Sequence, residues 1–164
     1  MAASSGSGTG KDAGGGEDVL QLVSFTLGNE EFAVDIHRVQ EINRMMDVTR
    51  VPNAPAHVDG VINLRGKVIP VIDLRARLGM ERKERDRTSR IIVIELRTVV
   101  VGFVVDSVRE VLRVPRSVTE PPPALAAGLE SEYITAVGKL EDRLLILLDL
   151  ERVMGVGEGV GLPA

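Results

Sequence analysis

NLRGKVIPVIDLR, at residues 63–75, is the stretch of this sequence that decides the fold. Apolar residues flank a turn at residues 65–67, and this pattern predicts a β-hairpin over residues 61–74. Gly66 can adopt the positive φ that a hairpin tip often needs. Pro70 has no N–H to donate to a neighbouring strand, so its strand is expected to lie at a sheet edge or to carry a bulge.

An aspartate and a short helix follow this hairpin, and the same order occurs near the C-terminus. VIDLRARLG at residues 71–79 aligns with LLDLERVMG at residues 147–155, 76 positions later. Asp73 and Asp149 each predict the N-cap of a short helix, which the closing glycine ends. The alignment indicates an internal repeat.

Two more pairs of segments extend this repeat. FAVD at residues 32–35 aligns with FVVD at 103–106, and VQEI at 39–42 aligns with VREV at 108–111. The order is the same in both halves, which predicts two repeat units, residues 19–86 and 87–156, within one domain over residues 19–156. Because each unit is too small to bury much alone, we expect two small barrels packed on a shared core.

The rest of the chain is punctuated by turns. Alternating apolar residues predict further hairpins over residues 23–36, 91–105 and 134–148. The segment Val39–Ile42 fits either a short strand or a single helical turn. Asn53 is a candidate cap for a short helix that ends at Gly60. Glu30 and Glu31 lie at a predicted hairpin tip, where paired carboxylates are ordinarily solvated.

Composition excludes several classes of protein. There is no cysteine, so disulfides and thiol nucleophiles are not possible. The net charge is −4 and aromatic residues make up 2% of the chain, whereas nucleic-acid binders usually need a basic excess and stacking rings. The sequence has no apolar run of membrane-spanning length and no signal peptide, so a cytoplasmic location is expected. The Gly-rich stretches at residues 1–18 and 157–164 are expected to be a disordered and a flexible tail.

Neither a catalytic nor a metal-binding site is predicted. His37 and His57 are isolated, and no set of acid, base and nucleophile emerges. The recurring Asp73 and Asp149 fit helix caps better than acid catalysts. We therefore expect a non-enzymatic protein.

Residues 63–75 closely resemble the most specific motif of the CheW family of bacterial chemotaxis coupling proteins. The resemblance covers nearly all of residues 20–154, and it is carried by VSFTLGNEEFAVDIHRVQEI (23–42), VTRVPNAPAHVDGVINLRG (48–66), VVVGFVVDSVREVL (99–112) and YITAVGKLEDRLLILLDLERVM (133–154). It implies two five-stranded SH3-like barrels around a shared hydrophobic core, which makes the expected fold all-β with a few short helices.

The resemblance also implies a function. Proteins similar to CheW couple the cytoplasmic tips of methyl-accepting chemotaxis receptors to the histidine kinase CheA, without catalytic activity or a cofactor. The implied partners are therefore receptors and a CheA-type kinase, with which a chain that is monomeric alone would form rings. No partner nucleic acid and no membrane insertion are implied, and the implied location is cytoplasmic, at the inner face of the membrane.

Site residues are carried over from the resemblance by position. The receptor-binding surface would comprise Val39, Glu41, Ile42, Gly60, Asn63 and Arg65. The kinase-binding surface would comprise Asp47, Val48 and Arg50. An apolar groove rimmed by polar groups suits a helical hairpin such as a receptor tip.

Alternatives stay open at these positions. Arg65 could donate hydrogen bonds to a partner, or it could bond the local backbone and hold the two barrels in register. Val39 and Ile42 could belong to the core, and the kinase-binding residues could form a solvated strand edge. The chain could also be an adaptor for surface motility or second-messenger output, or a small-barrel binder of nucleic acid or sugar.

Overall fold

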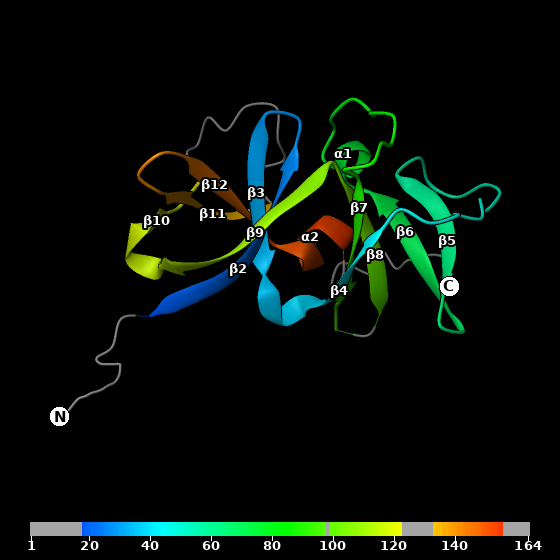
Figure 1. Ribbon diagram of the computed structural model, residues 1–164, viewed down its shortest axis with the longest axis horizontal. Coiled ribbons are helices and arrows are strands. Elements are labelled where there is room, and N and C mark those ends of the chain that lie inside the picture. Colours follow the sequence, from blue (N-terminus) through cyan, green and yellow to red (C-terminus); the bar gives the residue numbers. More distant parts are fainter. Residues whose placement is uncertain (1–17, 98, 123–132, 156–164) are drawn as a thin grey trace.

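The computed structural model describes residues 18–97, 99–122 and 133–155, and within these it contains two β-sheets that lie side by side with the helix α2 (Leu150–Met154) between them (Figure 1). The expected tails, apart from Asp18, lie outside these ranges. The prediction of an all-β chain with a few short helices is confirmed.

The two sheets have five and six strands. The five-stranded sheet has the order β4 (Val39–Arg44), β7 (Arg90–Glu95), β8 (Val100–Val105), β6 (Lys67–Asp73), β5 (Val58–Leu64). The six-stranded sheet has the order β10 (Thr119–Glu120), β11 (Ile134–Lys139), β12 (Leu144–Leu148), β3 (Glu30–Asp35), β2 (Val19–Leu27), β9 (Ser107–Pro115). The sixth strand, β10, is only two residues long.

Each sheet combines strands from both repeat units. The hairpin β2–β3 joins β9–β12 of the second unit, and the hairpin β7–β8 joins β4–β6 of the first. Parallel pairs make these connections: β3 lies beside β12, and β8 lies beside β6. The two units have therefore exchanged their first hairpins, and neither builds a sheet alone.

The helix caps recur in both units as expected. The side chain of Asp73 accepts a hydrogen bond from the backbone N–H of Ala76 at the start of α1 (Leu74–Arg77), at 3.2 Å. Asp149 accepts from Arg152 N–H in the same way, at 3.2 Å. The backbone N–H of Asp73 also bonds the carbonyl of His57, as that of Asp149 bonds the carbonyl of Tyr133, both at 2.9 Å.

The segments VQEI and VREV are strands in both units. Residues 39–42 begin β4, directly after a 3-10 turn at Ile36–Arg38, which resolves the choice between strand and helical turn. The register of β4 on β7 shifts between Val39 and Glu41, and that of β9 on β2 shifts opposite Arg109. A bulge therefore follows the valine of each segment.

Two predictions about local structure are wrong. No helix joins Asn53 to Gly60, because Asn53 itself takes a φ of 63° and Gly60 belongs to β5. The strand of Pro70 is not at an edge but lies between β5 and β8, and the bulge of the β5–β6 pair falls in β5, between Val58 and Gly60, and not in the strand of Pro70. Pro70 stands opposite Val61. Hydrogen-bonded and non-hydrogen-bonded pairs alternate along the ladder from the Leu64–Lys67 pair that closes the turn, so Val61 and Pro70 exchange no backbone hydrogen bonds. The missing N–H therefore costs the β5–β6 ladder nothing.

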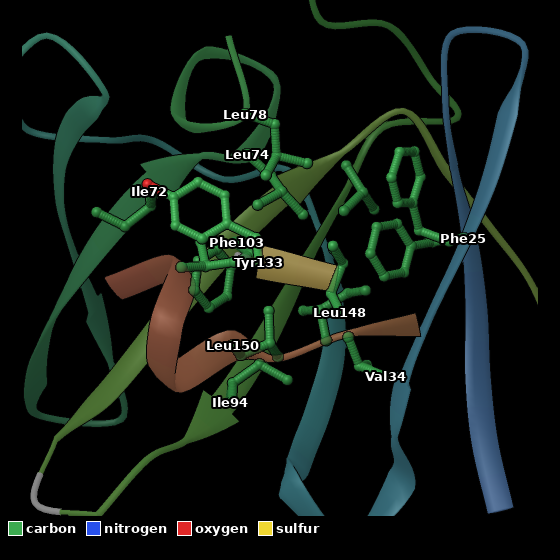
Figure 2. Close-up of a cluster of buried hydrophobic side chains, with 14 of the residues drawn as sticks. Phe25, Val34, Ile72, Leu74, Leu78, Ile94, Phe103, Tyr133, Leu148 and Leu150 are labelled. Carbon is green, nitrogen blue, oxygen red and sulfur yellow. The ribbon is translucent and has the colours of Figure 1, made fainter. Parts of the chain in front are cut away.

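A shared hydrophobic core joins the two sheets, as predicted. Figure 2 shows Phe25 and Val34 of the six-stranded sheet facing Phe103 and Ile94 of the five-stranded sheet, with Leu150 of α2 between them. The rings of Phe25 and Phe32 stack with their centroids 5.9 Å apart. Because one apolar cluster lies between both sheets, neither sheet can be removed without exposing the other.

A partly buried ion pair lies where the chain passes from one sheet to the other. Asp106 follows β8 and precedes β9, and its carboxylate accepts hydrogen bonds from Arg75 Nε at 2.8 Å and Nη2 at 2.7 Å. It also accepts from the backbone N–H of Gly28 in the β2–β3 turn, at 2.8 Å. The side chains of Arg75 and Asp106 are only 15% and 12% exposed, so this contact ties α1 to the crossing between the sheets.

Candidate protein-binding surface

The tip of the β5–β6 hairpin is a two-residue turn formed by Arg65 and Gly66. Their φ angles are 53° and 87°, the pair of positive values that a type I′ hairpin turn requires. Asn63 accepts a hydrogen bond from the Gly66 N–H through its side-chain oxygen, at 2.9 Å. Asn63 and Gly66 therefore shape the turn, while the side chain of Arg65 is left to point away from it.

Arg65 forms a two-pronged ion pair with Glu41 of β4. One guanidinium nitrogen donates to Glu41 Oε1 at 3.2 Å and the other donates to Oε2. These hydrogen bonds lower the pKa of Glu41 and raise that of Arg65. The contact lies within the five-stranded sheet, so Arg65 holds the hairpin to β4 and does not hold the two barrels in register. Its side chain is 72% exposed, which leaves the pair accessible to a partner.

The other predicted receptor-binding residues differ in exposure. Ile42, next to Glu41, is 38% exposed. Val39 is half-buried and packs against the shared core. Gly60 is buried, with a φ of 150°, and a Cβ there would lie 2.0 Å from the carbonyl oxygen of Thr49. Ile42, Asn63 and Arg65 can therefore meet a partner directly, whereas Gly60 lets two backbone segments cross.

The predicted kinase-binding residues line a groove rather than a strand edge. Asp47 and Arg50 are exposed and Val48 is half-buried against the apolar interior of the five-stranded sheet. Together with Met45, Met46 and the segment 51–56 they border a groove of about 1000 Å³. Thr49 makes the single backbone bridge in this stretch, to Val61, so the segment is mostly irregular.

The six-stranded sheet carries a counterpart of the Arg65–Glu41 pair that the sequence did not reveal. Arg143, in the β11–β12 turn, donates to Glu110 of β9, which matches Glu41 in the repeat. Its Nε also lies 3.2 Å from Glu31 Oε1. Glu31 is 8% exposed, so the expectation that it is solvated is wrong, because the guanidinium of Arg143 and that of Arg109 neutralise its carboxylate.

The histidines and acids of the described ranges do not assemble a reaction centre. His37 bonds the neighbouring Asp35 at 2.9 Å, and burial lowers the pKa of His57. Within residues 18–97, 99–122 and 133–155 no cluster of His, Asp and Glu could hold a metal ion. The same ranges contain no helix that is long and apolar enough to cross a membrane.

The fold and the hairpin surface define a class of protein. It is a protein-binding module built from two small β-sheets, whose distinctive side chains project from an exposed turn instead of surrounding a reacting group.

Comparisons with known proteins name the family. Residues 21–158 match the model of the CheW-like domain. The chain is 42% identical over 144 residues to the chemotaxis protein CheW of Klebsiella aerogenes, which covers 87% of both chains. It is 36% identical over 134 residues to CheW of Bacillus subtilis, covering 82% of this chain and 86% of that one. The chain belongs to the CheW-like family.

A solved relative confirms the fold and the functional class. The crystal structure of the scaffolding protein TtCheW from Thermoanaerobacter tengcongensis matches with a TM-score of 0.79 at 33% identity, over 85% of this chain and 94% of that one. The SH3-like architecture expected from the sequence is thus confirmed. The chain is a scaffold of chemotaxis signalling and not an enzyme.

Proposed function

We propose that this chain couples the cytoplasmic tips of methyl-accepting receptors to a CheA-type histidine kinase. The observation that supports this most strongly is the exposed Arg65–Glu41 pair beside Ile42, on a chain of the CheW-like family. A receptor tip is a helical hairpin, and an aliphatic side chain rimmed by charged groups suits the side of a helix. In this proposal the chain is monomeric alone, forms rings with the kinase, and stays in the cytoplasm at the inner face of the membrane.

The role of Arg65 can be tested by exchanging the charges of its ion pair. Arg65→Glu is expected to weaken binding to a purified cytoplasmic receptor fragment at least tenfold, because it removes the cation and repels Glu41. The exchanged variant Arg65→Glu/Glu41→Arg restores an ion pair without restoring the position of each charge. We expect it to recover the melting temperature but not the affinity, as measured by calorimetry. Full recovery of affinity would show that only the ion pair matters, and not contact with the receptor.

The kinase would contact the groove at Asp47, Val48 and Arg50. Arg50 is exposed and makes no ion pair within the part of the chain that the structure describes, so its charge is available to a partner. Arg50→Glu is expected to weaken binding to the regulatory domain of the kinase about tenfold in a pull-down titration, with receptor binding unchanged.

Arg113→Glu provides the matched control for this prediction. Arg113 is also exposed but lies on β9, in the other sheet. If Arg50→Glu and Arg113→Glu bind the kinase equally well, the kinase does not contact this groove.

A further inference from the structure

The most exposed large hydrophobic side chain of the described residues is that of Val68, at 70%. It is the second residue of β6 and stands opposite Asn63. Its neighbour Ile69 is 4% exposed and packs inside the five-stranded sheet. Since successive side chains of a strand point to opposite faces, Val68 points outward beside the Arg65–Gly66 turn.

The hairpin segment that carries Val68 has charges of one sign only. The hairpin segment VINLRGKV, residues 61–68, contains two cations and no acid. Glu41 neutralises Arg65, whereas Lys67 makes no ion pair with any described residue. Val68 therefore directly follows an uncompensated positive charge, Lys67, at the exposed first end of β6.

The second repeat unit offers an internal comparison. Leu144 stands 76 positions after Val68, at the start of β12, and is 59% exposed. There, however, the hairpin tip carries Glu141 and Asp142, and its cations Lys139 and Arg143 are paired with Glu120 and Glu110. The repeat thus presents an exposed aliphatic side chain twice, beside a basic tip in one sheet and beside an acidic tip in the other.

We infer that Val68 and Lys67 form part of the receptor-binding surface, and that they take a helix presenting an aliphatic side chain next to a carboxylate. The inference rests on the proposed function and names the partner chemistry at that site. The Arg65–Glu41 contact brings the hairpin tip against β4, so Lys67 and Val68 extend the proposed receptor-binding surface from the Arg65 turn along β6. The aliphatic contact supplies the buried area, and Lys67 selects a helix with an acidic residue.

Binding of a purified cytoplasmic receptor fragment from the same organism tests this inference. Val68→Asp is expected to weaken binding at least tenfold, because it removes the apolar contact and places a carboxylate against the acidic helix. Val68→Thr keeps the shape and strand propensity of valine and is expected to weaken binding about threefold, which guards against a folding defect of the aspartate variant. Lys67→Glu should also weaken binding and should reduce its dependence on salt.

Leu144→Asp is the matched control, since it adds the same charge at the equivalent position of the other sheet. We expect its affinity for the receptor fragment to stay within twofold of the unsubstituted chain. Equal losses for Val68→Asp and Leu144→Asp would overturn the inference, as would unchanged binding of all Val68 variants. If the unsubstituted chain does not bind the fragment at all, the proposed function fails and the inference fails with it.

Discussion

Gly60→Ala is expected to lower the free energy of unfolding by about 4 kcal/mol, a large share of the stability of a small domain. A Cβ on Gly60 would lie 2.0 Å from the carbonyl oxygen and 2.7 Å from the carbonyl carbon of Thr49, and both are backbone atoms that no rotamer change can move. The same carbonyl accepts the hydrogen bond of Val61 N–H at 2.8 Å, so relieving the clash breaks this bridge. The φ of 150° adds strain for any residue with a side chain. Denaturant unfolding would measure the loss.

Gly66→Ala is the control that separates backbone strain from collision. Gly66 also has a positive φ, 87°, but an added Cβ would meet nothing within 4 Å. Its cost should therefore be only about 1 kcal/mol. If both variants lowered the free energy of unfolding by similar amounts, a collision between the added Cβ and the backbone of Thr49 would not be the cause of the Gly60→Ala loss. A loss of receptor binding in Gly60→Ala would then reflect unfolding and not a missing contact, although Gly60 was predicted at the receptor-binding surface.

Arg75→Ala is expected to lower the free energy of unfolding by about 3 kcal/mol, because it leaves the partly buried carboxylate of Asp106 without its cation. Arg65→Ala removes a guanidinium from an exposed, solvent-screened ion pair and should lower the free energy of unfolding much less than Arg75→Ala does. A double-mutant cycle with Asp106→Ala should give a coupling energy of about 2 kcal/mol for the Arg75 pair. A coupling energy near zero would mean that the pair does not fasten α1 to the crossing between the sheets.

The same pair should respond to acid. Burial alone would raise the pKa of Asp106, but the hydrogen bonds from Arg75 and Gly28 outweigh it and hold the pKa below the ordinary value of 3.8. The stabilisation is therefore complete above that value and is lost as the pH falls through the lower pKa of the folded state. The difference in the free energy of unfolding between the unsubstituted chain and Arg75→Ala should therefore shrink as the pH falls below 3.8.

Local signals in the sequence predicted local structure well. The turn glycine Gly66 and the caps Asp73 and Asp149 act over two or three residues, and each lies where it was expected. The strand β9 was missed for an equally local reason. Val108, Val111 and Leu112 are spaced as on a helix, because the bulge at Arg109 interrupts the alternation of the strand.

Contacts between distant segments could not be predicted in the same way. Alternation of apolar and polar residues shows which face of a strand is buried, but it does not show which strand lies beside it. The parallel pairs β3–β12 and β6–β8 therefore have no sequence signature. The partners of Arg65 and Glu31 were missed because Glu41 and Arg143 lie far from them in the sequence and are brought to them only by the tertiary fold. The resemblance to the family correctly predicted two small barrels around a shared core, while it left open which strands form each of them.

The exchange of hairpins also sets the order in which the chain can fold during its synthesis. The five-stranded sheet uses a continuous stretch, from Val39 to Val105, and can close as soon as that stretch has left the ribosome. The first hairpin, β2–β3, must wait for β9 and β12, so Phe25 and Phe32 remain without their covering strands until nearly the whole chain is made. Because closing such a long loop is slow, this hairpin stays exposed to aggregation in a nascent chain. A chain stalled before Leu144 would therefore present a finished sheet and a β2–β3 hairpin whose neighbour β12 is still missing.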